Sequence, residues 1–359
     1  MRARFKRLEE RVAELQSAGL ARTLRPLFPT GPTTAELDGR EIQVFSSNDY
    51  LGLAWELRSS WRGRGAGSSR LIAGDRNAHH ALEEKLEELF CGPALVFPSG
   101  YQANMALMST LFEAGDVVAS DALNHASIID GLRLSKAERR VISHGDPSAI
   151  PKDSTAVVVE GLYSMDGDQL SLKEYQNKRR WLVVDEAHAV GCIGPKGRGA
   201  SYEQELVPDV VVGTLGKAYG AAGAFVICPW ELKQLLISKG RSFVYTTGLA
   251  EAAARAALVG IERADHARRE LLASRVRRFR AGLADLGRFP PGKDHIVPLV
   301  LGPSTMAAAQ ALLEEGFFVP GIRAPTVSKG QERLRFSLSA AHSDAQIDAL
   351  LTAIDKVLR

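Results

Sequence analysis

Six short apolar runs in the middle of the chain constrain the fold more than any other feature. Each has four or five residues, is rich in valine and is mostly apolar rather than alternating; they lie at 94–97, 116–120, 156–160, 181–185, 209–213 and 224–228. Strands that are buried on both faces have this pattern. The segments between the runs have helical patterns, so the sequence predicts an α/β fold whose central sheet is mainly parallel and covered by helices.

The pattern changes after residue 250. There the sequence predicts one long helix, a strand, a helix, a half-buried strand and a last helix, at 250–285, 295–302, 307–315, 333–339 and 343–358. A short amphipathic helix that ends near Gly19 is expected at the N-terminus. We therefore expect three parts, namely an N-terminal arm over 1–44, a large domain over 45–250 and a small C-terminal α/β domain over 251–359.

Composition excludes several classes of protein. The 359 residues carry a net charge of +3, too close to neutral for a nucleic-acid surface or a polybasic membrane surface. No apolar run reaches the roughly 18–20 residues of a membrane span, and no apolar core follows the basic N-terminus as in a signal peptide. The 3 cysteines are scattered and lack CxxC spacing, so we expect no metal site and a reducing, cytoplasmic location.

A lysine follows the fifth apolar run, in the segment TLGKAYG at 214–220. Burial of an ammonium group is costly and lowers its pKa, which makes Lys217 a candidate amine nucleophile. The alternative is a surface lysine in a glycine-rich turn. Because Gly213 and Gly216 lie too close together for GxxxxGK[ST], the segment is not a phosphate-binding P-loop.

The segment DEAHAVG at 185–191 ends another apolar run with an aspartate. A buried carboxylate needs a cationic partner, and the protonated ring nitrogen of pyridoxal phosphate is one. His188 would then reach the phenolic oxygen of that cofactor. The alternative is a helix-capping aspartate with a packing histidine, but Asp185 and Lys217 both close buried strands, which favours the functional interpretation.

Two further loops carry candidate ligands. PSGY at 98–101 joins a strand to a helix, and the free N–H groups at such a helix start bind anions such as a cofactor phosphate. His125, in the loop after the second run, would stack on a pyridine ring. A plain turn and a structural histidine are the alternatives. His79 and His80 are expected at the solvated start of a helix.

Seven segments together resemble the α-oxoamine synthases, which join an amino acid to an acyl thioester with loss of carbon dioxide. They are FSSNDYLGL (45–53), PSGYQAN (98–104), LNHAS (123–127), EGLYSMDGD (160–168), DEAHAVG (185–191), TLGKAYG (214–220) and RLRFSLSAAH (333–342). The resemblance extends from about residue 20 to the C-terminus. It implies a fold-type-I pyridoxal-phosphate-dependent transferase.

The resemblance implies a role for each matching residue around the cofactor. Lys217 would bind pyridoxal 5'-phosphate covalently, Asp185 would pair with the ring nitrogen, His188 would contact the ring oxygen and His125 would stack on the ring. The remaining cofactor contacts would be Gly100, Tyr101, Ser164, Thr214, Thr246 and Thr247. Because the two threonines would reach a phosphate in a neighbouring subunit, a homodimer with shared sites is expected.

The substrate-binding residues implied by the resemblance are Arg25, Asn48, Thr326 and Arg335, of which Arg335 would bind the amino-acid carboxylate in bidentate fashion. The likeness is greatest to the branch that condenses L-alanine with a pimeloyl thioester of coenzyme A or acyl carrier protein. That reaction gives 8-amino-7-oxononanoate, carbon dioxide and free thiol in biotin biosynthesis. The segment RAPTV at 323–327 is the main support, although Ala324 stands where that branch usually has proline.

Other functions stay open from the sequence. Residues 328–331 are more similar to glycine C-acetyltransferase, and serine palmitoyltransferase and 5-aminolevulinate synthase share the same motifs. An aminotransferase on the same fold is a different reaction class. A non-catalytic partner subunit is a third alternative, which the presence of Lys217 disfavours.

Overall fold

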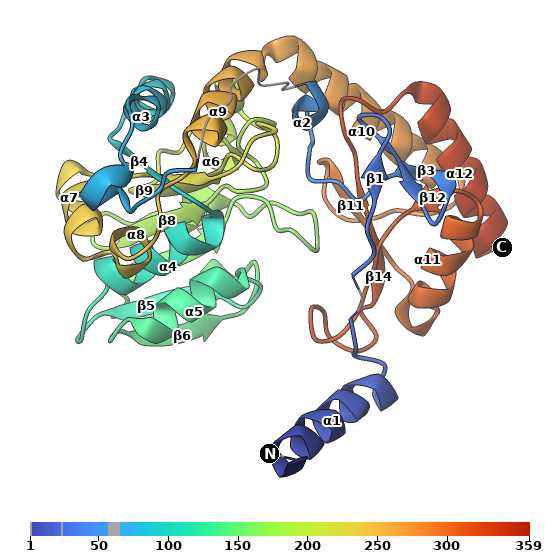
Figure 1. The fold of residues 1–359 in the computed structure, drawn as a ribbon, viewed down its shortest axis with the longest axis horizontal. Coiled ribbons are helices and arrows are strands. Elements are labelled where there is room, and N and C mark those ends of the chain that lie inside the picture. The colour runs from blue at the N-terminus through green and yellow to red at the C-terminus, as the bar shows by residue number, and fades with distance from the viewer. Residues whose placement is uncertain (1, 23, 57–64) are drawn as a thin grey trace.

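A seven-stranded sheet forms the centre of the larger of two lobes in the computed structural model, which describes residues 2–22, 24–56 and 65–359 (Figure 1). Its strands, given in spatial order, are β4 (Ala94–Phe97), β10 (Ala224–Ile227), β9 (Val210–Thr214), β8 (Trp181–Asp185), β7 (Ala156–Glu160), β5 (Val117–Asp121) and β6 (Glu138–Ile142). From β9 to β6 all neighbours are parallel, and only β10 pairs antiparallel with both of its neighbours. The predicted α/β fold with a mainly parallel sheet is confirmed.

Helices cover both faces of this sheet. They are α3 (Asn77–Phe90), α4 (Gly100–Leu111), α5 (Ala126–Leu134), α6 (Ala200–Glu203), α7 (Trp230–Lys239), α8 (Arg241–Val244) and α9 (Glu251–Arg263). Successive strand residues point to opposite faces, so Val157 and Val159 pack in the core with α3 and α9, whereas Val158 packs with α4 and α5. The sheet is therefore buried on both faces, as its valine-rich strands predict.

The smaller lobe contains two further sheets. One is antiparallel, in the order β11 (Ile296–Val300), β14 (Arg333–Ser337) and β13 (Gly321–Ile322). The other contains β1 (Phe28–Pro29), β2 (Thr34–Leu37), β3 (Arg40–Val44) and β12 (Phe317–Phe318). Helices α10 (His266–Asp285), α11 (Thr305–Glu314) and α12 (Asp344–Leu358) pack beside them. Because β3 pairs with β12, residues from the N-terminal arm belong to the C-terminal lobe in space; the domain boundaries stay a prediction.

Two helices lie outside these layers. Helix α1 (Arg2–Ser17) ends close to the predicted Gly19 and projects away from both lobes, while the short α2 (Leu53–Glu56) lies between them (Figure 1). The capping box that predicts the last helix is present, since Ser343 Oγ accepts the N–H of Gln346. No helix within the described ranges is long and apolar enough to cross a membrane.

Three sequence predictions are wrong in detail. The single helix over 250–285 is two helices, since the chain breaks at Ala264 and Asp265, where the Asp265 carboxylate accepts the N–H of Arg268 and begins α10. Strand β14 is buried at all five positions rather than half-buried, because Leu334 and Phe336 pack in the core while Arg333 and Arg335 contact residues 164–166. His79 is buried rather than solvated, and its ring bonds the carbonyl of Leu249 at 2.7 Å.

Candidate active site

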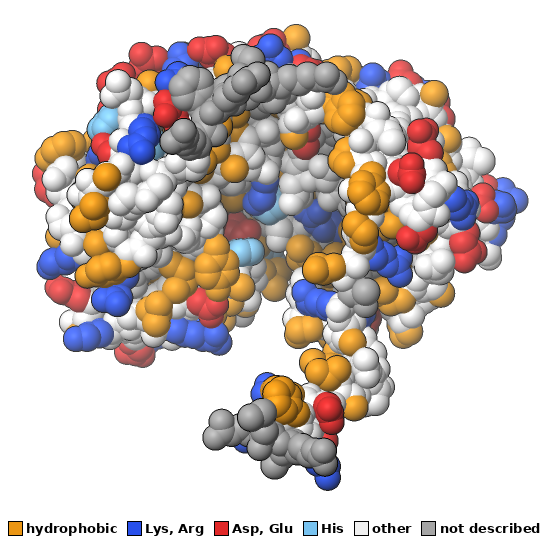
Figure 2. Space-filling view, viewed as in Figure 1, with side chains coloured by type: hydrophobic (Ala, Val, Ile, Leu, Met, Phe, Trp, Pro, Cys, Tyr) orange, Lys and Arg blue, Asp and Glu red, His pale blue; other side chains and the backbone are white. Residues whose placement is uncertain are grey.

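A cavity of about 240 Å³ lies where the carboxyl ends of β7, β8 and β9 meet the start of α4. Parallel strands deliver the residues that follow them to one edge of the sheet, which explains the position of this cavity. Its polar lining is formed by Gly100, Tyr101, Asn104, His125, Ser127, Glu160, Asp185, His188, Thr214 and Lys217. Figure 2 shows the hollow between the two lobes, with acidic, basic and histidine side chains inside it.

Lys217 lies at one end of a chain of hydrogen bonds. Its Nζ is 2.9 Å from His188 Nε2, and His188 Nδ1 is 2.7 Å from the hydroxyl of Tyr50, which donates to Asn48 Oδ1 at 3.0 Å. Burial lowers the pKa of Lys217 to about 8, although the charges of Asp185 and Glu160 oppose this shift. A fraction of Lys217 is therefore an unprotonated amine near neutral pH.

His188 is held neutral by the same surroundings. Burial lowers its pKa well below the ordinary range, and the positive charges of Lys217 and Arg335 add to this effect. When Lys217 donates to Nε2, the proton of the ring is on Nδ1 and points to Tyr50. Tyr50 was not among the residues expected at the site, although the segment FSSNDYLGL contains it.

Asp185 is a buried carboxylate with no cationic partner among the described residues. One oxygen accepts the amide N–H₂ of Asn104 at 2.7 Å and the other accepts the backbone N–H of Ala187 at 2.9 Å. Asn104 Oδ1 is buried without any hydrogen-bond partner. A buried carboxylate that lines a cavity and forms no ion pair has room for a cation there, as a protonated pyridine nitrogen would be.

His125 caps the N-terminus of α5 and lines the cavity. Its Nδ1 accepts the backbone N–H of Ser127 at 3.2 Å, and the ring lies edge-on to that of Tyr101 with the centroids 6.3 Å apart. The backbone N–H of His125 donates to Glu160 Oε1 at 2.6 Å. Glu160 lines the cavity beside Asp185 and was missed by the sequence reasoning; burial raises its pKa well above the ordinary range, and Asp185 adds to the shift.

The start of α4 has the features of an anion site. Ser99 caps the helix, a side chain at Gly100 would meet no atom within 4 Å, and the first N–H groups of a helix have no partner within it. Thr214 Oγ1 accepts the N–H of Gly216 at 3.3 Å and so orders the turn before Lys217. Thr246 Oγ1 accepts from Gln102 on α4 at 3.0 Å, and Thr247 is exposed next to it.

Arg335 is a buried cation with no carboxylate partner among the described residues. Its guanidinium donates to the carbonyl of Ser164, to Ser337 Oγ at 2.8 Å and to Asn48 Oδ1 at 3.4 Å. Arg333, two positions away on the same strand, is equally buried but pairs with Asp166. The structure thus brings Arg335, Asn48 and Ser164 together beside the lysine cavity, with one uncompensated positive charge.

None of the four expected substrate residues lines the cavity itself; Asn48 and Arg335 lie beside it, whereas the other two lie on the surface. Arg25 is exposed, and Thr326 lies on the surface of the small lobe, where its Oγ1 accepts from Arg22 at 3.3 Å. The guanidinium of Arg323 holds the same N-terminal segment through the carbonyls of Gly19 and Ala21. The structure therefore joins the N-terminal segment to residues 323–326 and leaves Arg25 and Thr326 outside the lining of the Lys217 cavity.

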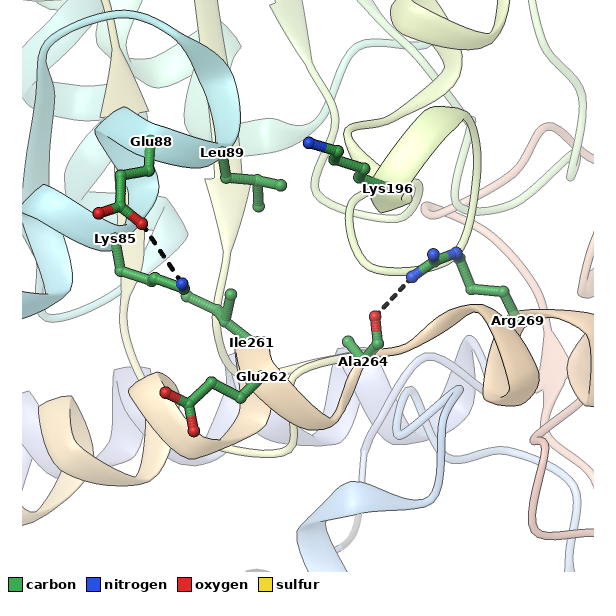
Figure 3. Close-up of a pocket in the computed structure, with 8 residues that line it drawn as sticks. All are labelled: Lys85, Glu88, Leu89, Lys196, Ile261, Glu262, Ala264 and Arg269. Carbon is green, nitrogen blue, oxygen red and sulfur yellow. Dashed lines mark hydrogen bonds and ion pairs between the residues drawn. The ribbon is translucent and has the colours of Figure 1, made fainter.

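A second hollow, of about 430 Å³, lies on the outer surface between α3 and the α9–α10 junction (Figure 3). Lys85 pairs with Glu88 at 3.3 Å, and Arg269 donates to the carbonyl of Ala264. None of the expected site residues lies here. No group of metal-binding side chains occurs in the described part of the chain.

The sequence profile of the family described as Aminotransferase class I and II matches residues 40–354. The chain belongs to this family. It is 43% identical to the 8-amino-7-oxononanoate synthase of Methylococcus capsulatus, with 96% of each chain covered. It is 41% identical to the enzyme of the same name from Alkalilimnicola ehrlichii, over 98% of this chain and 97% of the relative.

Solved structures agree with this assignment. A serine palmitoyltransferase of Sphingomonas wittichii is 31% identical with a TM-score of 0.87, and covers 98% of this chain and 96% of its own. An 8-amino-7-oxononanoate synthase of Francisella tularensis is 29% identical with a TM-score of 0.76, over 88% of this chain and 98% of its own. The predicted fold-type-I transferase architecture and membership of the α-oxoamine synthases are confirmed.

Proposed function

We propose that this protein is a pyridoxal-phosphate-dependent acyltransferase that condenses L-alanine with a pimeloyl thioester of coenzyme A or acyl carrier protein. The products are 8-amino-7-oxononanoate, carbon dioxide and free thiol, a step of biotin biosynthesis. One observation carries the proposal. The cavity is lined by Lys217, whose pKa is lowered, and by Asp185, which forms no ion pair, and beside it lies Arg335, which has no carboxylate partner. The full-length similarity to 8-amino-7-oxononanoate synthases supports the choice of substrates.

The residues fit pyridoxal 5'-phosphate. Asp185 offers a buried carboxylate to the ring nitrogen, and the start of α4 at Gly100 offers free N–H groups to the phosphate. A serine palmitoyltransferase of S. paucimobilis, 30% identical with a TM-score of 0.88 over 99% of this chain and 97% of its own, is described with bound PLP-myriocin. His125, His188, Tyr101, Ser164 and Thr214 would complete the cofactor contacts.

When bound, pyridoxal phosphate supplies an aldehyde that captures amines and a protonated ring that withdraws electrons from the α-carbon of an amino acid. Asp185 would hold the proton on the ring nitrogen, because a buried carboxylate favours a cation beside it. Lys217 would hold the cofactor covalently through its amine. As a free amine, Lys217 would accept the α-proton of the amino acid, for which a pKa of about 8 suits it near neutral pH.

Arg335 and Asn48 orient the amino acid. A guanidinium binds a carboxylate through two parallel hydrogen bonds, so the substrate carboxylate would supply the missing counter-charge of Arg335. His188 keeps the lysine amine aligned through its Nε2, and Tyr50 fixes the ring from the other side. Arg25 and Thr326 remain expected substrate contacts on the resemblance alone, because both are exposed and neither lines the cavity.

Two exposed apolar surfaces support a homodimer with shared active sites. On α1, Phe5, Leu8, Val12 and Leu15 form an apolar stripe that is about half exposed, and the helix touches neither lobe (Figure 1). Leu71, Ile72 and Tyr245 are also exposed, close to Thr246 and Thr247. Exposed apolar patches of this kind mark protein interfaces. The proposed location is the cytoplasm, where the three free cysteines stay reduced.

Release of free thiol tests the proposed function. Purified enzyme loaded with pyridoxal phosphate is assayed with alanine, glycine or serine against pimeloyl, acetyl, succinyl and palmitoyl thioesters. We expect the highest kcat/KM for alanine with the pimeloyl thioester. A preference for glycine with acetyl or succinyl donors, or for serine with palmitoyl, would assign another α-oxoamine synthase activity. Conversion of the cofactor to its amine form without any thioester would indicate an aminotransferase.

A further inference from the structure

His144 bridges two carboxylates outside the cofactor cavity. Its Nδ1 is 2.9 Å from Asp121 Oδ1, at the end of β5, and its Nε2 is 2.9 Å from Asp168 Oδ2. Burial by itself lowers the pKa of His144, but the hydrogen bonds to both carboxylates raise it to about 10. The ring also packs edge-on against Tyr163, with the centroids 4.4 Å apart. His144 is therefore a cation at neutral pH.

The two carboxylates depend on this single cation. Asp121 Oδ2 and Asp168 Oδ1 are buried without a hydrogen-bond partner, and no Lys or Arg of the described ranges pairs with either residue. Removal of the imidazolium would leave the buried Asp121 and the partly buried Asp168 as two negative charges without a counter-charge. The charge of His144 thus links the ends of β5 and β6 to the segment that contains Asp168.

That segment, residues 163–169, is a loop of the large lobe that contacts the small lobe, and we name it the bridge loop. It is closed on itself, because the N–H of Tyr163 donates to the carbonyl of Asp168 at 3.0 Å. Gly167 has a φ of +66°, and a Cβ there would lie 2.2 Å from the carbonyl oxygen of Ile296 on β11. Gln169 donates to Asp294 at 2.8 Å. The small lobe therefore packs directly against this loop.

The bridge loop also holds the arginine that lacks an anion. The carbonyl of Ser164 accepts from Arg335 Nε, which sets one edge of the guanidinium. Its Nη1 and Nη2 point to Ser337 and Asn48. A shift of Ser164 would turn the guanidinium away from the direction in which it meets a carboxylate, and a misplacement of about 1 Å costs up to about 100-fold in rate.

We infer that His144 is a positioning residue: by holding Asp168 it fixes the bridge loop, and through Ser164 the loop orients Arg335 toward the carboxylate of the amino-acid substrate. This inference rests on the proposed function. It assigns to His144 no contact with substrate or cofactor, so its effect reaches the site only through Ser164 and Arg335 and falls mainly on amino-acid binding. The thioester and the cofactor phosphate bind elsewhere and are not expected to depend on it.

Two variants test the inference. His144→Gln removes the cation but keeps polar groups, and Asp168→Ala severs the loop from His144 while the pair with Asp121 remains. Both are expected to raise the alanine KM about tenfold and to leave the thioester KM within about twofold. Amide hydrogen exchange of the holoenzyme should become faster in residues 163–169. The matched control is His80→Gln, which breaks an exposed histidine–carboxylate pair with Asp75 and should change none of these values.

A combined variant separates positioning from a general structural effect. If His144 acts through Arg335, then His144→Gln should add nothing to the alanine KM of an Arg335→Met enzyme. The inference would be overturned if the alanine KM stays unchanged in both single variants. It would also be overturned if the effects of His144→Gln and Arg335→Met on the alanine KM add, or if the alanine and thioester KM values rise equally. Loss of the folded state in both variants would also overturn it, because the cluster would then only stabilise the fold. If the wild type prefers glycine or serine, the proposed function fails, and the same comparison is made with that amino acid.

Discussion

Replacement of Arg335 by methionine should weaken substrate binding without weakening the fold. A bidentate contact with a carboxylate contains two charge-assisted hydrogen bonds of about 1.5–3 kcal/mol each. Loss of one of them alone lowers affinity by roughly 10- to 150-fold, since about 1.4 kcal/mol is a factor of ten. We therefore expect the alanine KM of Arg335→Met to rise by at least about tenfold, while the thioester KM changes little.

Stability should respond differently, because Arg335 is buried without an anion. Its three hydrogen bonds go to neutral oxygen atoms, and their loss is offset by relief of the several kcal/mol that desolvation of an unpaired cation costs. The free energy of unfolding should change by less than about 1 kcal/mol. Arg333→Met is the matched comparison, since Arg333 is equally buried on the same strand but pairs with Asp166, which is 30% exposed. Loss of that pair should cost about 2 kcal/mol.

The assay combines steady-state kinetics with urea unfolding of each holoenzyme in the absence of amino acid. Arg335→Met should raise the alanine KM more and lower the free energy of unfolding less. Arg333→Met should lower the free energy of unfolding more and raise the alanine KM less. An alanine KM that stays within twofold of wild type in Arg335→Met would refute the assignment of Arg335 to the substrate carboxylate. A stability loss as large as that of Arg333→Met would refute the claim that the charge of Arg335 is uncompensated.

Three other predictions concern the cofactor, pH and assembly. Wild-type protein should be yellow, with a cofactor that borohydride fixes to Lys217, and Lys217→Ala should be inactive; a fully active variant would contradict the mechanism. Because the folded-state pKa of His144 is raised from 6.5 to about 10, its stabilisation should be complete below pH 6.5 and lost as pH rises through 10, so urea midpoints of wild type and His144→Gln should converge at high pH. Leu8→Glu combined with Val12→Glu should shift the protein toward monomer in sedimentation, and an unchanged dimer would show that α1 is not at the interface.

The large sheet was predictable because its strands are buried on both faces and therefore valine-rich. Strand β6 was missed because it lacks this pattern. It is an edge strand that begins Glu138-Arg139-Arg140, and its side chains at these positions reach solvent, so no apolar run marks it. The break between α9 and α10 was missed because Ala264 and Asp265 interrupt two helical patterns that continue in similar composition on both sides.

The candidate site was predictable where a motif residue follows directly after a strand. Asp185 and Lys217 reach one cavity because parallel strands end at one edge. Partners supplied by tertiary structure were not predictable in the same way. Asn104 meets Asp185 across 81 positions of the chain, and Tyr50 meets His188 across 138. The quoted motifs contain both residues, but nothing local in them indicates these contacts.

Charge balance, rather than burial, separates Asp185 and Arg335 from His144 and Arg333. His144 and Arg333 are charged and at least partly buried, but each faces a carboxylate, so their charges are neutralised within the chain. Asp185 and Arg335 are just as inaccessible and have only neutral partners among the described residues. Unbalanced buried charge is costly unless a ligand completes it. The site therefore favours a bound cation beside Asp185 and a bound carboxylate beside Arg335, on either side of the Lys217 amine.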